Sequence, residues 1–545
     1  MEQINLENLS PEVIKYINAL KSENSSLQKE NVDLKNKVQK QEQFISNLTE
    51  MLVNDRKKMF GRSSEQMKYI EGAEQISLFN EAEKESAAGA AEPDEKTLVA
   101  AHERSRKRTK EDLTKGLEYI KQVCEITPAV CPNCGEPLTE IGVEFVRSEL
   151  NIIPAQIFVI DIYQKRYKCE HCSDDEQTNI FKAPTPVPVI KKSMATAATI
   201  AYVMQQKYQL GLPLYRMEQY WDAEGVELKR NNLANWIIRG SLWFRPLWER
   251  MREILLSEDI IHADETPLRV LKRDGQQSDS QSRMWVFCSG KHSEHKMSLY
   301  YHHATRSGKV AQDILGDYSG YLQTDGYAGY NILDNVTHIG CFAHAKRYFV
   351  QCVPKGISEK DSKAAHALAL IGKIFAADEG FVDVPESSGK QRTAVLKPLF
   401  DEYFNYISTI NAPGGSKLEK AVTYSLNQRK QLENTLLDSR LELTNNLAER
   451  AIKPFVVGRK NWLFCDTDKG ADASARCYSI VESAKLNNLN VFAYLSHLLT
   501  ELPKLGAHPT SEQLDKLMPW SDVLPEFCKT LSGKGDTNGE KEIDS

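Results

Sequence analysis

A single acid stands among amides and bases in the run Leu443-Thr444-Asn445-Asn446-Leu447-Ala448-Glu449-Arg450-Ala451-Ile452-Lys453-Pro454. The spacing of its apolar residues predicts a short amphipathic helix. Two earlier β-branched or aromatic runs each carry an Asp at or near the end of an expected strand: Asp264 in Ile260–Thr266 and Asp325 in Tyr321–Tyr327. Three such carboxylates can hold magnesium or manganese, since these hard cations take oxygen ligands. Two ions together clamp the attacking and leaving oxygens of a phosphodiester.

The bulk composition predicts a modular, soluble protein. A chain of 545 residues is too long for one hydrophobic core, so we expect about three or four domains. No run approaches the roughly 18 apolar residues that span a bilayer, and the start, Met1-Glu2-Gln3, is unlike a signal peptide. We therefore expect a cytoplasmic protein without a membrane partner. The net charge of -6 excludes a uniformly basic coat, so contacts with phosphate must come from local patches.

Cysteine usage predicts one structural zinc ion. The eleven cysteines are an odd number and do not resemble a disulfide framework. Four of them form two C-x-x-C pairs, Cys131 with Cys134 and Cys169 with Cys172. Each pair places two thiolates on one tight turn, as zinc knuckles require, and the intervening run from 141 to 167 is rich in strand-forming residues, as in a zinc ribbon. Chance pairing of free cysteines, or a redox role, is the weaker alternative.

The N-terminal region carries a heptad pattern that predicts a parallel coiled coil. Its a positions are Ile17, Asn24, Asn31, Val38, Ile45 and Leu52, and its d positions are Leu20, Leu27, Leu34, Gln41 and Leu48. Asn at a with Leu at d is typical of a dimer, and five heptads form a rod of roughly 50 Å. We therefore expect a homodimer or higher oligomer. The alternative is one amphipathic helix that packs on its own domain.

Two basic segments are candidate DNA contacts. After a linker from Glu81 to Asp94, a basic run contains Arg104, Arg106, Lys107, Arg108 and Lys110, which suit phosphate unless they only face solvent. Later, a helical region from Met194 to about Leu256 contains a possible helix-turn-helix. Its second helix, Lys229 to Ile238, opens with Lys229 and Arg230. The alternative is an ordinary helical hairpin with Trp221 and Trp236 in its core.

The pattern from Asp259 onward predicts a sheet with helices. We expect an antiparallel meander of three strands, Ile260–Leu271, Met284–Ser289 and Met297–His302. A helix near Lys309–Leu315, a strand ending at Asp325, a strand Thr337–Cys341 and a helix Ala343–Val350 follow. With a short helix near Tyr327, this is the element order of the ribonuclease-H fold. Residues from about Pro354 to Leu441 are typical of a mainly helical insertion.

The resulting expectation is a multidomain α/β protein with these boundaries: coiled coil and following helix, 1–80; linker with basic run, 81–128; zinc ribbon, 129–175; helical DNA-binding region, 176–256; first part of a ribonuclease-H-like catalytic core, 257–353; helical insertion, 354–441; second part of the core, 442–495; C-terminal element, 496–532; and disordered tail, 533–545.

Taken together, the acid motifs, zinc pairs and zipper resemble the DDE transposases of the IS66 insertion-sequence family. The resemblance covers almost the whole chain, without a broken motif. The matching stretches are FGRSSE at 60–65, CPNC at 131–134, YQLGLPLYR at 208–216, HADETPL at 262–268, QTDGYAGY at 323–330, CFAH at 341–344, 445–454, GRKNW at 458–462 and LMPW at 517–520. The family implies DNA cleavage and transfer at the ends of a mobile element, with Asp264, Asp325 and Glu449 as the triad. It also implies double-stranded DNA as partner and small accessory proteins from the same element.

Each acid of the triad has an alternative reading. Glu265 stands beside Asp264, but strand alternation sends the two side chains to opposite faces. Asp325-Gly326 is also a common hairpin turn. Glu449, next to Arg450, has the appearance of a surface acid, although Lys453 one turn later favours a phosphate-binding face.

Further candidate DNA contacts lie near the acids. His344, Lys346 and Arg347 occupy one expected helix, although a helical His is often structural. Arg450 and Lys453 accompany Glu449. Downstream, Arg459 and Lys460 suit phosphates and Trp462 suits stacking on an unpaired base, with a core tryptophan as the equal alternative.

Two other functions compete with transposition. A DNA-binding regulator with a decayed catalytic domain would have lost at least one acid, and none is lost. A cellular nuclease of the same fold would hydrolyse DNA without joining it, and the sequence does not separate that activity from transposition.

Overall fold

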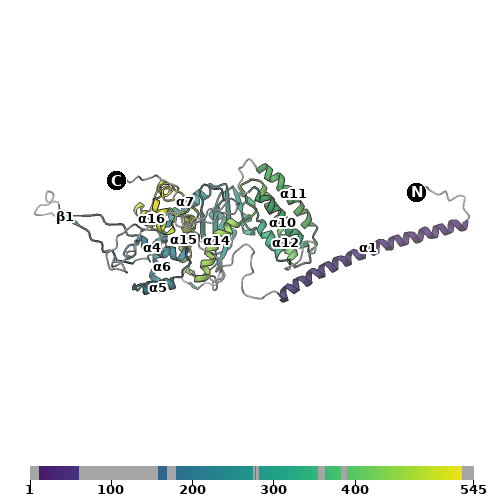
Figure 1. The fold of residues 1–545 in the computed structure, drawn as a ribbon, viewed down its shortest axis with the longest axis horizontal. Helices are drawn as coiled ribbons and strands as arrows, with labels where there is room; N and C mark the ends of the chain where they lie inside the picture. Colours follow the sequence, from purple (N-terminus) through teal and green to yellow (C-terminus); the bar gives the residue numbers. More distant parts are fainter. Residues whose placement is uncertain are drawn as a thin grey trace, which may run out of the picture. The chain divides into compact units, whose positions relative to one another are not determined.

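The computed structural model describes residues 11–60, 157–168, 180–273, 276–277, 281–353, 362–381 and 389–530 (Figure 1). Its contacts define two compact units. The helical unit comprises Met1–Ile76, Gln323–Gly326 and His338–Asn445, and the sheet unit comprises Ser77–Leu322, Tyr327–Thr337 and Asn446–Ser545. The four zinc-pair cysteines and the basic run 104–110 lie outside the described residues. Among the described helices, none is both long and apolar enough to cross a membrane.

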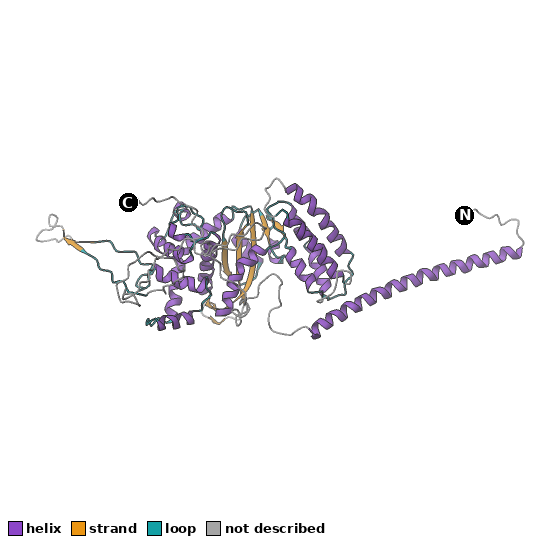
Figure 2. Ribbon diagram, in the orientation of Figure 1, coloured by secondary structure: helices purple, strands orange, loops and turns teal. Residues whose placement is uncertain are grey.

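The expected meander is present and forms one side of the sheet. Strands β3 (Ile260–Arg273), β5 (Gln281–Ser289) and β6 (Ser298–His303) pair antiparallel (Figure 2). The strand order is β6-β5-β3-β7-β8, and β4 (Gln276–Gln277) and β9 (Cys465–Thr467) also pair with β3. Strands β7 (Tyr321–Gln323) and β8 (Thr337–Ile339) each begin in the sheet unit and end in the helical unit.

Both short strands end earlier than the sequence predicted. β7 ends at Gln323, two residues before Asp325, and β8 ends at Ile339, before Gly340. The cause near Asp325 is a turn at Gly326, whose φ of +86° lies outside the extended region. Asp325 therefore stands in a turn and not at the end of a strand.

The register of the meander assigns each side chain to a face of the sheet. Asp264 lies opposite Val286, which lies opposite Tyr300. Residues directly opposite in antiparallel strands share a face, so Asp264 and Tyr300 point to the same side. Glu265 is in the neighbouring row, opposite Trp285, and points to the other side.

Helices cover both faces within the sheet unit. On the Tyr300 face, α14 (Asn446–Trp462) packs against β3 and β5. Helix α15 (Asp468–Leu486) lies along the edge strand β6, where the backbone N–H groups of Ser298 and Tyr300 donate to Ser483 and Ser479 at 3.0 and 2.8 Å. These bonds satisfy groups that an uncovered edge would expose. On the opposite face, Trp285 contacts Tyr330 of η3 (Ala328–Ile332) at 5.8 Å between ring centroids.

The predicted helical region before the sheet is confirmed. It consists of α4 (Ala197–Tyr208), α5 (Leu214–Ala223), α6 (Arg230–Gly240), η2 (Ser241–Phe244) and α7 (Arg245–Leu255). Trp221 and Trp236 are buried where α5 and α6 pack together. Other elements of this unit are β1 (Arg166–Lys168), β2 (Ile180–Lys182), α8 (Gly308–Leu315), α16 (Val491–Leu505), α17 (Ser511–Asp515) and η7 (Glu526–Cys528).

The segment expected to be a helical insertion is helical and has its own core. Its elements are α10 (Lys363–Glu379), α11 (Gly389–Ser408), α12 (Lys417–Asn427), α13 (Arg429–Glu433) and η6 (Asn434–Leu436), and Figure 1 shows α10 to α12 side by side. They pack with α9 (Phe342–Val350), where the Phe342 ring lies 4.9 Å from that of Phe400. Arg392, with 4% of its side chain exposed, pairs with Asp378 at 2.7 Å.

Helix α14 differs from the expected helix at both ends. It begins at Asn446 because the preceding backbone is already bonded: the Leu443 carbonyl accepts from Phe342 N–H at 2.8 Å, and Asn445 N–H donates to Cys341 Sγ at 3.2 Å. It also continues through Pro454 to Trp462. Proline removes one backbone bond and usually breaks a helix, but packing of Ile452 and Phe455 in the core holds this one together.

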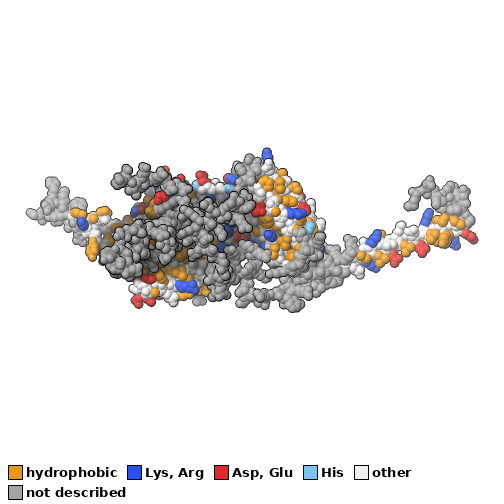
Figure 3. Space-filling model, viewed as in Figure 1, with side chains coloured by type: hydrophobic (Ala, Val, Ile, Leu, Met, Phe, Trp, Pro, Cys, Tyr) orange, Lys and Arg blue, Asp and Glu red, His pale blue; other side chains and the backbone are white. Residues whose placement is uncertain are grey.

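Helix α1 (Pro11–Phe60) confirms that the heptad region is helical. Its d-position residues Leu20, Leu27 and Leu34 are 47%, 52% and 51% exposed, and hydrophobic side chains follow the helix in Figure 3. Among the side chains that the structure describes, none covers these exposed leucines. Pairing of two such helices stays a prediction.

Candidate active site

The meander presents Asp264 on the face covered by α14. Its side chain is half-buried, and its Oδ1 accepts from the Glu265 backbone N–H at 2.8 Å. Carboxylate oxygens are the ligands that hard divalent cations take in proteins. Asp264 therefore fits the role of an oxygen ligand.

The neighbouring acid, Glu265, is bound by two other side chains on the opposite face of the sheet. Only 1% of its side chain is exposed, and it forms an ion pair with Arg306, whose Nε donates to Oε1 at 2.8 Å. The Tyr330 hydroxyl donates to Oε2 at 3.0 Å. The Arg306 guanidinium in turn lies 3.7 Å from the ring centroid of Tyr327. Glu265 thus stabilises the opposite layer of the fold.

Helix α14 brings Glu449 to the side of the sheet that carries Asp264. The hydroxyl of Tyr300, in the same row as Asp264, donates to the carbonyl of Ala451, two residues after Glu449. Farther along the helix, Arg459 donates to the hydroxyl of Thr266 at 3.2 Å. These contacts place the first turns of α14 over the Asp264 row. Glu449 is half-buried in the first turn, where the helix dipole favours negative charge.

Asp325 belongs to the helical unit, whereas Asp264 and Glu449 belong to the sheet unit. The Asp325 side chain is half-buried, and its backbone carbonyl accepts from the Tyr424 hydroxyl at 2.8 Å. Two residues earlier, the buried amide of Gln323 donates to the carbonyls of Gly340 and Glu442 at 3.2 and 2.7 Å. All three acids are thus half-buried, and carboxylate oxygens suit a hard divalent cation better than a soft one.

Several candidate DNA contacts are exposed in the sheet unit. Arg450, Lys453 and Lys460 of α14 face solvent, as does Arg230 at the start of α6. Lys229 is also exposed and lies 3.9 Å from Glu218 in an ion pair. Arg459 is half-buried, and burial together with the nearby Arg283 lowers the pKa of its guanidinium. An anionic phosphate would relieve this repulsion.

Trp462 is packed in a way that favours the core alternative. Its ring lies 5.6 Å from that of Phe455, and the Lys207 ammonium lies 5.0 Å from its centroid. The next two residues, Leu463 and Phe464, are 66% and 42% exposed. If a base stacks at this end of α14, these exposed side chains are more accessible to it than the indole.

The candidates on α9 lie in the helical unit. Arg347 donates to Nε2 of His344 at 2.9 Å, so these two side chains support each other. Lys346 is exposed, with its ammonium 5.7 Å from the Phe375 ring. Of the three, Lys346 is the most accessible to a phosphate.

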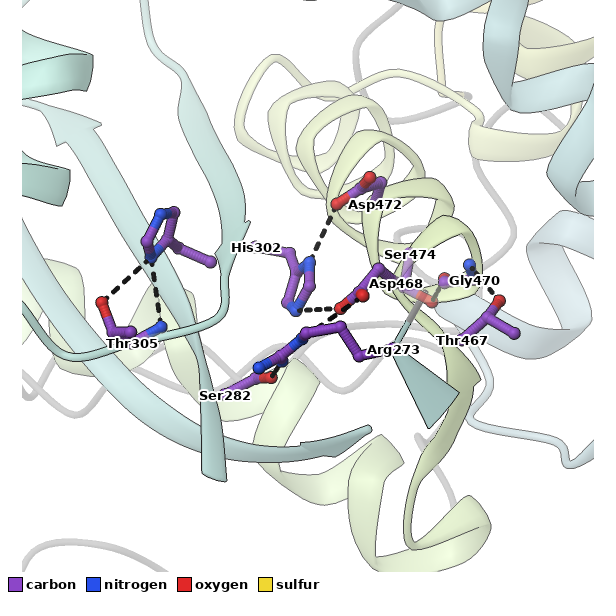
Figure 4. A network of polar contacts seen from close by, with 10 residues as sticks. Arg273, Ser282, His302, Thr305, Thr467, Asp468, Gly470, Asp472 and Ser474 are labelled. Atoms are coloured by element: carbon purple, nitrogen blue, oxygen red, sulfur yellow. Dashed lines mark hydrogen bonds and ion pairs between the residues drawn. The ribbon is translucent and has the colours of Figure 1, made fainter. Parts of the chain in front are cut away.

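A polar cluster that was not predicted lies at the start of α15 (Figure 4). His302 of β6 has 4% of its side chain exposed, and its Nδ1 lies 2.9 Å from Asp472 while its Nε2 lies 3.7 Å from Asp468. Arg273 reaches Asp468 at 3.4 Å and donates to Ser282 at 2.7 Å. The cluster fixes α15 to three strands. Its members are far apart in the chain, so no local motif could have revealed it.

Four family models match this chain. The one described as "Transposase IS66 family" covers residues 192–473, more than half of the chain. "Zinc-finger binding domain of transposase IS66" covers 128–173, which includes all four paired cysteines. "IS66 C-terminal element" covers 479–520, and "Transposase C of IS166 homeodomain" covers 47–120.

Similar proteins include two from Sinorhizobium fredii (strain NBRC 101917 / NGR234). The uncharacterized protein y4qI is 27% identical over 88% of this chain and 89% of its own length. The uncharacterized protein y4jD is 29% identical over 75% of this chain and 81% of its own length. No solved structure matches the chain.

Proposed function

This chain belongs to the IS66 family of transposases, and on that premise we propose that it cuts and joins DNA at the ends of an insertion sequence through Asp264, Asp325 and Glu449. The observation that carries the proposal is the bond from Tyr300 to Ala451, which sets the Glu449 helix over the row of Asp264. Glu265, the competing acid, is used by Arg306 and Tyr330. We further propose that the sheet has the ribonuclease-H fold, supported by three antiparallel strands followed by helix, strand, short helix and strand.

The three carboxylates would bind two magnesium or manganese ions. Such ions would supply activation of an attacking water and stabilisation of the departing 3′ oxygen. Asp264, Asp325 and Glu449 would supply the carboxylate oxygens that hold these ions. Once cleavage has freed a 3′-hydroxyl, that group replaces water as the nucleophile on target DNA. The reaction needs neither a covalent protein intermediate nor ATP.

DNA binding would be distributed over several segments. The family match supports a zinc-finger module at 128–173, and we propose that Cys131, Cys134, Cys169 and Cys172 hold one zinc ion in it. The basic run 104–110, the start of α6 at Lys229 and Arg230, and the basic residues of α9 and α14 would contact phosphates. The coiled coil would pair two chains, one for each end of the element, with small accessory proteins as further partners.

The test is direct incubation of the full chain with a duplex that carries an element end, in magnesium or manganese. We expect a nick at the end of the element and covalent joining of that end to a second duplex. Hydrolysis without joining would favour a nuclease. Binding without a nick in either metal would favour a DNA-binding regulator.

A further inference from the structure

The turn that carries Asp325 is held from one side by helix α12. The Tyr424 hydroxyl donates to the Asp325 carbonyl at 2.8 Å. The next residue, Gly326, has a φ of +86°, and a Cβ at that position would come within 2.8 Å of the Gln428 side-chain amide. Tyr424 and Gln428 are one helical turn apart, so two successive side chains contact the same two residues of the turn.

Tyr424 is itself fixed in its place. Its ring lies 4.9 Å from that of Tyr348 on α9, and α12 is anchored below it by buried Leu418 and Ala421. The Tyr424 hydroxyl is therefore preorganised for the Asp325 carbonyl.

The insertion also covers the strand to which the Asp325 segment is joined. Thr324 N–H donates to the Ile339 carbonyl at 3.1 Å, which links that segment to β8. On the side of the insertion, Gly340 N–H donates to the Gln431 carbonyl at 2.8 Å, and the Asn434 amide donates to the His338 carbonyl at 2.9 Å. The backbone around Asp325 thus depends on the insertion for its contacts.

We propose that the helical insertion serves to position Asp325, and that Tyr424 is the positioning residue that holds its turn. This proposal rests on the proposed function, in which Asp325 is a metal ligand. Groups that orient a ligand govern metal affinity, and losing one typically weakens binding about 10-fold to 100-fold. Without the hydrogen bond from Tyr424 to the Asp325 backbone carbonyl, the turn would be able to move. The Asp325 carboxylate would then move with it.

Tyr424→Phe tests this, because it removes the hydroxyl and keeps the ring that packs on Tyr348. Tyr403→Phe is the matched control: its hydroxyl is also buried and donates to Ser425 of the same helix at 2.8 Å, without contacting the turn. Gln428→Ala is a second variant that loosens the contact with Gly326. For each full-length protein we would measure Mn²⁺ binding by electron paramagnetic resonance, the magnesium dependence of end cleavage, and thermal unfolding.

We expect Tyr424→Phe to bind Mn²⁺ about tenfold more weakly and to need correspondingly more magnesium for cleavage. Gln428→Ala should shift both measurements in the same direction, and Tyr403→Phe should lower only the melting temperature. Equal metal binding by the Tyr424 and Tyr403 variants overturns the proposal. If wild-type protein binds Mn²⁺ but does not cleave, the proposed function fails while the binding comparison still decides the role of Tyr424. If wild-type protein binds no Mn²⁺, both fail.

Discussion

The Tyr300 hydroxyl donates a hydrogen bond to the backbone carbonyl of Ala451. Tyr300 is fully buried, and burial raises the pKa of its hydroxyl, so it remains a donor. Because Tyr300 shares a row with Asp264, this one bond relates the position of the Glu449 helix to the strand that carries the first acid. This hydrogen bond between residues far apart in the sequence thereby aligns α14 with β3, the two elements that carry Glu449 and Asp264.

Tyr300→Phe should therefore impair cleavage beyond its effect on stability. Loss of one buried hydrogen bond lowers the free energy of unfolding by about 1 kcal/mol, and a freer α14 should slow cleavage about tenfold. Tyr494→Phe is the control, since its equally buried hydroxyl donates to the Leu517 carbonyl at 2.7 Å, away from α14. Cleavage rates and urea unfolding of both variants decide the matter. Equal losses of cleavage rate in the Tyr300→Phe and Tyr494→Phe variants would mean that Tyr300 contributes only to the stability of the core.

The triad variants Asp264→Asn, Asp325→Asn and Glu449→Gln should each abolish cleavage while binding of element ends survives. Each amide keeps the shape of the acid but removes a charge that the metal needs. Glu265→Gln provides the contrast: it should retain cleavage and lose about 1 kcal/mol of stability through its weakened contact with Arg306. Gel-shift and nicking assays measure binding and cleavage separately. Wild-type cleavage by any triad variant removes that residue from the site.

Zinc content tests the paired cysteines. Protein purified without chelator should contain one zinc per chain, and Cys131→Ser should lose it together with the local fold, because metal binding supplies much of the folding energy of so small a module. Elemental analysis gives the metal content, and limited proteolysis between residues 128 and 173 reports the fold. Protein that carries no zinc would contradict the ribbon assignment.

Local patterns in the sequence identified most elements of the sheet and of the helical regions, including the three strands of the meander. Strand alternation also placed Asp264 and Glu265 on opposite faces, which the register confirms. Contacts between distant segments were not predictable in the same way. The late start of α14 depends on Phe342 and Cys341, and the turn at Asp325 depends on Tyr424. In each case a partner about a hundred residues away decides the local conformation.

Lys207 gives a pH-dependent prediction. Burial lowers the pKa of its ammonium to about 8 from 10.5. Between these values the unfolded chain binds a proton that the folded chain does not, so this group makes stability rise with pH. Lys207→Met should be more stable than wild type at pH 7, by about 1 kcal/mol because Lys207 is part-exposed and its ammonium lies over Trp462. The difference should shrink as the pH rises from about 8 and vanish only above the unfolded-state pKa of 10.5.

Urea denaturation at several pH values measures the difference in stability between Lys207→Met and wild type. Buried thiols such as Cys477, whose pKa burial raises, lower stability as the pH rises, but they are present in both proteins and so cancel in the comparison. The exposed Lys516→Met is the control and should show no such trend. A Lys207→Met advantage that is constant from pH 7 to 10 would mean that the ammonium stays charged throughout.

The last prediction concerns assembly through α1. Its apolar seam is exposed in the single chain, and two element ends must be brought together for coordinated transfer. A parallel pair of these helices would place two DNA-binding regions at the same end of the rod. Deleting residues 1–55 should leave the folding of the catalytic domain intact but weaken dimerisation and the pairing of element ends.

Replacing Asn24 and Asn31 with Val should strengthen association of the α1 helices while loosening the choice of oligomer, because the seam gains apolar contact and loses its register signal. Light scattering on the isolated segment at roughly tens of micromolar measures its state, since an isolated helix is marginal in water without a partner. A monomer contradicts the coiled coil, and a trimer contradicts the arrangement of one chain for each end.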